Sequence, residues 1–204
     1  MPARPLAPAP PQGAHVIAHW ARTRGVPFEA RPDEAWFRHW EPYDTMAPPS
    51  FYFNACTIHA PPGVIVLVEP WTSTSEETEP LERTLLGFAT HPGLVRRAAI
   101  RVGESFLTRV AFLESPPPPT VKVGDKLWDE HVVTFAASPL EAATAFHTRL
   151  RHLLAGWGFQ GHLELRAGGL VCHYASLAPI PENYSRMRRI LIEITNTAIA
   201  YPRR

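Results

Sequence analysis

Apolar and polar side chains alternate most clearly in residues 161–175, on either side of Gly168-Gly169. Alternation with a period of two predicts β-strands, and a Gly-Gly pair between two such runs predicts a tight hairpin turn. With both glycines in the turn, Glu164 lies opposite His173 on a face that we expect to be outside the core. The other face holds the apolar side chains of the hairpin, namely Leu163, Leu165, Leu170, Cys172 and Tyr174.

The segments on either side of this hairpin have other periods. The β-branched run at 132–135 predicts a strand. Ser138 followed by Pro139 is typical of a helix start, and apolar residues then recur every three or four positions as far as Trp157. We therefore expect one long helix there, and a second helix that begins at Pro181.

The first half of the chain shows shorter patterns. A Pro/Ala-rich tail at 1–13 is expected to be disordered, which leaves 14–204 as a single domain. Proline residues at 116–119 form a rigid connector that could join two halves of this domain. The expected elements are a helix at 14–24, a short aromatic helix within 31–49, a hairpin formed by 50–60 and 64–68, strands within 82–90 and 95–102, and a helix at 103–113.

Taken together, these elements predict an α+β protein with a mainly antiparallel sheet and helices packed on one face. Residues 128–200 also resemble uncharacterised bacterial proteins of unknown function. The shared features are a strand that leads into Ser138-Pro139-Leu140-Glu141-Ala142, the hairpin segment from Gly161 to Leu170, and a closing helix. The resemblance concerns fold-forming positions, so it implies an architecture and no activity.

Composition narrows the function classes. The chain has 204 residues, 45% of them apolar, and a net charge of +1. A balanced charge gives no overall attraction to nucleic acid or anionic membranes, and no apolar run approaches the ~18 residues of a membrane span. The N-terminus lacks the pattern of a secretory signal, and two cysteines do not make a disulfide framework. We therefore expect a cytoplasmic protein with reduced thiols.

Candidate chemistry is sparse in this sequence. Ten histidines are present, but their spacing predicts no metal site, and no phosphate-binding loop predicts a cofactor. The most specific polar pair is Glu164 with His173, where a carboxylate could orient an imidazole base. The alternative for this pair is an ordinary cross-strand ion pair.

Aromatic residues are concentrated in the first half of the chain. The candidate binding residues are Trp36, Trp40, Tyr43, Tyr52 and Trp71. Such side chains serve either as interface anchors or as core filling, and both alternatives stay open. Because catalytic motifs are missing, we favour a non-enzymatic binding or assembly module that acts through a protein partner, self-association or an apolar ligand. The alternative is an enzyme or metal-binding protein with a His/Glu site.

Overall fold

A computed structural model describes residues 9–72, 83–103 and 118–200. Residues 104–113 of the expected helix at 103–113, residues 1–8 of the N-terminal tail and residues 116–117 of the proline connector lie outside these residues. The helices are α1 (Ala14–Arg22), α2 (Ala35–Arg38), α3 (Lys126–His131), α4 (Pro139–Ala145), α5 (Thr148–Gly156) and α6 (Pro181–Ile199). The strands are β1 (Phe28–Glu29), β2 (Phe51–Ala60), β3 (Gly63–Trp71), β4 (Leu86–Thr90), β5 (Ala98–Val102), β6 (Thr120–Val121), β7 (Val133–Phe135), β8 (Gly161–Arg166) and β9 (Gly169–Tyr174).

The described strands form one nine-stranded antiparallel sheet in the order β1-β2-β3-β4-β9-β8-β5-β7-β6. This confirms the predicted α+β class with a mainly antiparallel sheet. The hairpin expected from 50–60 and 64–68 is present as β2 and β3. Strands β4 and β5 are both present but are not neighbours, because the β8–β9 hairpin is inserted between them. Strands from both sides of the proline connector therefore share one sheet.

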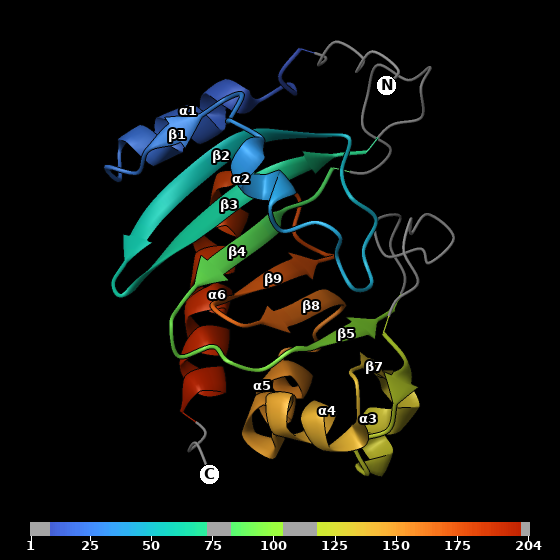
Figure 1. Cartoon of the computed structure of the whole chain (residues 1–204). Coiled ribbons are helices and arrows are strands. Elements are labelled where there is room, and N and C mark those ends of the chain that lie inside the picture. The colour runs from blue at the N-terminus through green and yellow to red at the C-terminus, as the bar shows by residue number, and fades with distance from the viewer. Residues whose placement is uncertain (1–8, 73–82, 104–117, 201–204) are drawn as a thin grey trace.

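Most of the helices cover one face of the sheet. Helix α6 crosses behind the strands, and α3, α4 and α5 gather near β7 (Figure 1). Apolar side chains of α1, α3, α4, α5 and α6 join strand residues such as Ile65, Leu163 and Cys172 in one large core. Tyr184, Met187 and Leu191 are fully buried, so the apolar stripe predicted for the last helix is the one that meets the sheet.

The opposite face of the sheet is covered by α2 and by the segment that follows it (Figure 1). This second core is rich in aromatic rings, and Phe88 lies at its centre. Its buried members are Phe37, Tyr43, Met46, Tyr52, Ala55, Val66, Val68, Leu86, Phe88 and Val171. The sheet is thus buried on both faces in its middle, and the prediction of a solvent-facing outer side for the β8–β9 hairpin was wrong.

The turn of the β8–β9 hairpin also differs from the prediction. Leu165 pairs with Leu170, so Ala167 and Gly168 are the turn residues. Gly168 has φ +87°, which suits a residue without a side chain. Gly169 belongs to β9 instead, where a Cβ atom would lie 2.4 Å from Cη2 of Trp40. The second glycine is therefore required by packing against Trp40.

This two-residue difference in register preserves the faces of the hairpin but changes the cross-strand pairs. His162 lies opposite His173, and Glu164 lies opposite Val171. The predicted direct pairing of Glu164 with His173 was therefore wrong.

The long helix predicted after Ser138 is divided in two at Phe146 and His147. Phe146 has φ −98° and ψ 61°, and His147 is extended, so the helical hydrogen bonds stop between α4 and α5. Arg151 donates from Nη1 to the carbonyl oxygen of Phe146 at 2.8 Å, and His147 Nε2 lies 3.1 Å from the carbonyl oxygen of Thr197 in α6. These tertiary contacts satisfy polar groups at the break, which the apolar periodicity alone does not reveal.

Candidate functional site

A groove with mainly apolar walls lies between α3 and α5, beside β5, and has a volume of about 470 Å³. Its walls include the side chains of Ile100, Val102, Leu127, Trp128, Leu154 and Phe159. Trp128 and Leu154 are buried, so they also connect the groove to the main core. The groove therefore extends that core to the surface of the protein.

Helix α3 is held in place by polar contacts at its ends. Asp125 caps its start, because its carboxylate accepts a hydrogen bond from the Trp128 backbone N–H at 3.3 Å. The carboxylate of Asp129 accepts two hydrogen bonds from the preceding loop, from the N–H groups of Val123 and Gly124, both at 3.0 Å. These contacts fix one wall of the groove.

The same wall is tied to the sheet and to α5. The indole Nε1 of Trp128 donates to Thr134 Oγ1 in β7 at 3.0 Å. Arg151 in α5 donates from Nε to Asp125 Oδ2 at 3.2 Å, so one ion pair connects the two helices that form the groove. Because these charges compensate each other, they make the groove electrically neutral at this point. The groove is suited to hold apolar material.

Leu127 is the most unusual residue of this groove, because 73% of its surface is exposed. It lines the groove while its neighbour Trp128 is buried. Leu140 in α4 is 77% exposed and does not line the groove, so it provides a natural comparison. Leu127 thus extends the apolar lining of the groove outward, where a ligand can cover it.

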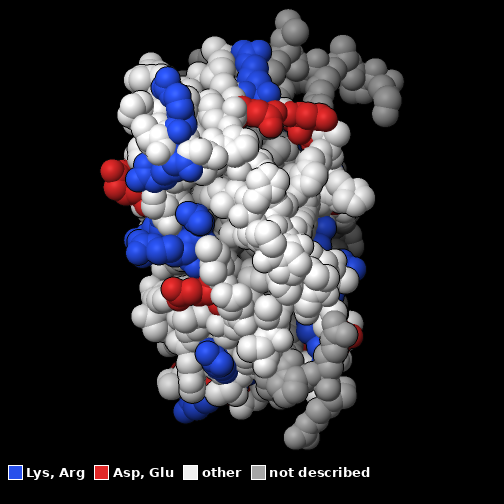
Figure 2. Space-filling model, turned by 90° about the vertical axis from the view of Figure 1, so that its left-hand side faces the viewer, with Lys and Arg blue, Asp and Glu red and all other residues white. Residues whose placement is uncertain are grey.

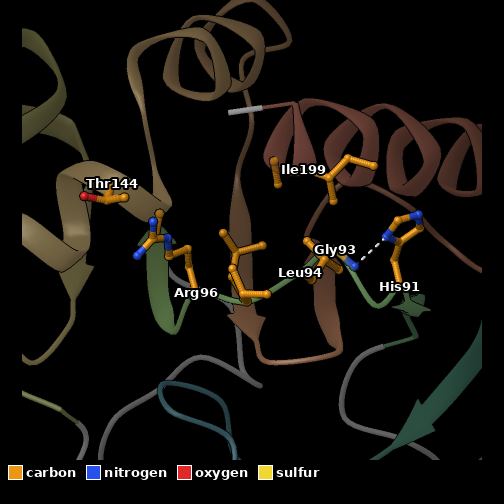
Figure 3. A pocket seen from close by; sticks show the side chains of 10 residues that line it. His91, Gly93, Leu94, Arg96, Thr144 and Ile199 are labelled. Carbon is orange, nitrogen blue, oxygen red and sulfur yellow. Dashed lines mark hydrogen bonds between the residues drawn. The ribbon is translucent and has the colours of Figure 1, made fainter. Parts of the chain in front are cut away.

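A second, smaller cavity of about 300 Å³ lies between the β4–β5 loop, α4 and the end of α6. Figure 3 shows Arg96 extending from this loop toward Thr144, while Leu94 and Ile199 supply apolar walls. The loop is shaped by a hydrogen bond from the Gly93 N–H to His91 Nδ1 at 2.9 Å. Its walls mix polar and apolar groups, whereas the α3–α5 groove offers a more continuous apolar lining.

Glu164 lies beneath the irregular segment at residues 40–47 and is fully buried. Its Oε2 accepts a hydrogen bond from the Asp44 N–H at 2.8 Å, and its Oε1 is bound by the guanidinium of Arg166. Burial alone would raise the pKa of this carboxyl, but the imidazole of His162, 3.4 Å from Oε2, together with Arg166 and the Asp44 N–H, holds it below its usual range. Glu164 is therefore a fixed buried carboxylate.

His173 is also fully buried, and its Nε2 lies 3.0 Å from Thr84 Oγ1. Burial lowers the pKa of His173 to about 3, with a smaller contribution from nearby His162. The predicted catalytic pair is thus sealed from solvent, and each of its members bonds to a different partner. Catalysis by this pair stays a prediction, and it would require residues 40–47 to move.

The five aromatic candidates separate into two groups. Tyr43, Tyr52 and Trp71 are buried, and the hydroxyl groups of the two tyrosines lie 2.9 Å apart. Trp36 is 37% exposed, and Trp40 is half-buried beside it at a centroid distance of 5.6 Å. The core alternative therefore describes the first group, whereas the indoles of Trp36 in α2 and of Trp40 just after it reach the surface.

Metal and nucleophile candidates find little support in this arrangement. Among residues 9–72, 83–103 and 118–200, no three His, Cys, Asp or Glu side chains are grouped to hold a metal ion. Cys56 and Cys172 are buried thiols, and burial raises the pKa of each to about 12. Such thiols are poor nucleophiles at neutral pH.

On the side of the molecule shown in Figure 2, basic and acidic side chains lie mostly toward the edges of a broad uncharged area. The described part of this side therefore lacks the continuous basic surface with which proteins bind nucleic acid. None of the helices within the described residues is long and apolar enough to cross a membrane. The cytoplasmic location stays a prediction from the sequence.

The sequence did not point to the α3–α5 groove, because its walls come from three separate segments, 100–102, 125–132 and 151–160. One available signal was Leu127, an apolar residue among the charged neighbours of a short helix that Asp125 caps. Local periodicity cannot show that this leucine lies beside Ile100 and Phe159. That proximity depends on the packing of α3 and α5 against β5.

Comparisons with known proteins show a shared fold. No protein-family model matches the chain, and no curated protein sequence matches it. A solved structure that it resembles is the mycobacterial trehalose monomycolate transport factor A, TtfA. The two structures have a TM-score of 0.60 and 9% sequence identity, over 95% of this chain and 99% of the other. At this identity the likeness establishes a common architecture across nearly the whole chain.

Proposed function

We propose that this protein is a non-enzymatic binding module that holds the acyl chain of an amphiphilic ligand in the α3–α5 groove. The observation that carries this proposal is Leu127, which is 73% exposed at an apolar groove of about 470 Å³. Burying such a side chain against a ligand gains roughly 1.5–3 kcal/mol, so its exposure in the free protein favours a bound state. The volume lies within the range of roughly 300–1,000 Å³ that is common for small-molecule sites.

The distribution of polar groups supports an amphiphilic ligand. Asp125 and Arg151 are bonded to each other, so they need no charged group from a ligand. His131 and His152 are exposed side chains that also line the groove. An acyl chain could therefore lie against Ile100 and Leu127 while its polar head group stays near the imidazoles and water.

The structural neighbour supports the same class of ligand. TtfA is named as a transport factor for trehalose monomycolate, which is a lipid. A common architecture does not transfer function by itself, so this likeness adds to the argument from the groove and does not replace it. An apolar segment of a partner protein, or a second copy of this chain, is the competing occupant.

Binding of a fluorescent fatty acid, cis-parinaric acid, tests this proposal directly. The wild-type protein should bind the probe saturably, and Leu127→Asp should weaken binding by at least about tenfold, because tenfold corresponds to about 1.4 kcal/mol. Leu140→Asp is the matched control, since it places the same charge on another exposed helical leucine. It should leave the dissociation constant within about twofold of wild type.

Two outcomes would overturn the proposal. One is the lack of saturable probe binding to wild-type protein whose circular dichroism shows a native fold. The other is an equal effect of Leu127→Asp and Leu140→Asp on binding. Light scattering then distinguishes an acyl ligand from a second copy of this chain as the occupant of the groove. A molecular mass that rises with concentration in the wild type, but not in Leu127→Asp, would assign the groove to self-association.

A further inference from the structure

Residues 40–47 have no regular secondary structure, yet residues 43–47 of this segment lie buried against the middle of the sheet. We call this segment the strap. Tyr43, Thr45 and Met46 are all buried, and Met46 belongs to the same apolar cluster as Leu86 and Val171. Irregular segments normally run over the surface, because their backbone groups need water or other polar partners. The strap therefore depends on partners that the sheet supplies.

Side chains of β8 supply most of these partners. The guanidinium of Arg166 donates to the carbonyl oxygens of Trp40 and Pro42, the latter at 2.6 Å. Glu164 accepts from the Asp44 N–H at 2.8 Å. These contacts hold the strap through charged groups, which are stronger hydrogen-bond partners than neutral ones.

Further polar contacts lie along the strap. Thr45 Oγ1 lies 2.5 Å from His162 Nδ1, and Arg97 pairs with Asp44 at 3.0 Å. The side chain of Arg97 is itself mostly exposed, so water competes for that ion pair. The closed position of the strap thus rests chiefly on β8.

We propose that the strap opens in acid and that His173, buried beside it, takes up the proton that favours the open state. His173 lies across the strands from His162 and from Leu86, and the strap contacts His162 directly and shares an apolar cluster with Leu86. Its Nδ1 is buried without a hydrogen-bond partner among the described residues. Within the part of the chain that the structure describes, a proton placed on Nδ1 finds no hydrogen-bond acceptor while the strap is closed.

The side chains around His173 decide whether a proton on its ring favours the closed or the open strap. Strands β3 and β4 present apolar side chains there, including Val68 and Leu86. Among the described residues, the charged or titratable groups of this region include Glu41, Tyr43, Asp44, Tyr52, Arg97, Arg101, His162, Glu164 and Arg166. Of these, Glu164 is engaged by Arg166 and by the Asp44 N–H, so it is not free to pair with His173.

His162 behaves differently from His173. Its Nε2 lies 3.4 Å from Glu164 Oε2, so the ring of His162 faces a carboxylate within the closed structure. His173 Nδ1 has no such partner among the described residues, so the inference rests on His173.

The direction of the pH effect on strap opening follows from the pKa of His173 in the closed and the open states. Its pKa is about 3 in the closed structure and 6.5 for an ordinary exposed histidine. Because the folded pKa is lowered, the closed state is fully favoured above about pH 6.5 and loses stability as the pH falls toward 3. Between pH 7 and pH 5 the population of the open strap should rise by about 25-fold.

Hydrogen–deuterium exchange measured by mass spectrometry at pH 7 and pH 5 tests this inference on the full-length protein. After correction for the intrinsic pH dependence of exchange, protection of the strap amides should fall by about 25-fold. Protection in the middle of α6 should stay constant, because α6 packs on the other face of the sheet. The inference would be overturned if protection of the strap amides fell by less than about threefold, or if it fell in parallel with the protection of α6.

Two variants identify the proton acceptor. His173→Gln keeps a group that can bond Thr84 and removes the titration, so the fall in strap protection should shrink to less than threefold. His59→Gln is the control, because His59 is an exposed strand histidine and its loss should leave the 25-fold change intact. Retention of the full change in His173→Gln would refute the role of His173, and the wild-type comparison with α6 decides the matter even if that variant does not fold.

Discussion

Replacing Phe88 by alanine tests whether the aromatic segment is a packed core. Phe88 is fully buried in β4, and its ring lies 5.3 Å from Trp36, 5.6 Å from Phe37 and 5.3 Å from Trp40, measured between centroids. Truncating a buried phenylalanine costs roughly 3–5 kcal/mol. With three aromatic neighbours that lose a partner, we expect the upper half of that range, about 4–5 kcal/mol.

Urea unfolding followed by circular dichroism measures this loss as a lower transition midpoint at unchanged slope. Phe88→Leu is the matched variant, because it keeps an apolar side chain at the same position and should cost about 1–2 kcal/mol. Tryptophan emission gives a second readout, since Trp36 and Trp40 both pack on Phe88 and should become more solvent-exposed in Phe88→Ala. A loss below about 1.5 kcal/mol in Phe88→Ala, or equal losses in both variants, would refute the packed arrangement.

Three further predictions concern packing, capping and thiol chemistry. Gly87→Ala should destabilise the protein by about 1–3 kcal/mol in urea unfolding, because a Cβ atom there would lie 2.7 Å from Leu191 Cδ1 in α6; a neutral effect would show that α6 can shift. Ser138→Ala should cost about 1 kcal/mol in the same assay, because the Ser138 hydroxyl accepts a hydrogen bond from the third residue of α4, and Ser138→Asp should restore most of it. Cys56 and Cys172 should react with Ellman's reagent at pH 8 only after unfolding, since burial raises the pKa of both thiols to about 12; rapid reaction of the native protein would contradict their placement.

The helix starts and strand faces were predictable because they depend on neighbouring residues. Ser138 caps α4 as expected, since the signal for a cap lies within four positions of the chain. Leu163 and Cys172 face the main core, as their alternation with polar residues predicted. Such patterns also gave the α+β class, because each one fixes an element and the face that it buries.

The burial of the opposite face of the sheet beneath the strap was not predictable in the same way. His162 and Glu164 alternate with leucines as surface residues do, yet the strap buries them. Polar side chains become buried when a distant segment brings partners for them, as Asp44 and Thr45 do here. The spacing within β8 carries no information about a segment 120 residues away.

The sequence alone thus determined the β2–β3 and β8–β9 hairpins, the starts of α4 and α6, the faces that meet the main core and the class of the fold, since each follows from interactions over a few residues. The tertiary structure decided which strands are neighbours, and it placed Gly169 under Trp40 and not in the turn. It also brought Leu127 beside Ile100 to form the groove. These features depend on contacts between residues far apart in the chain, whose energies appear only once the helices and the sheet have packed together.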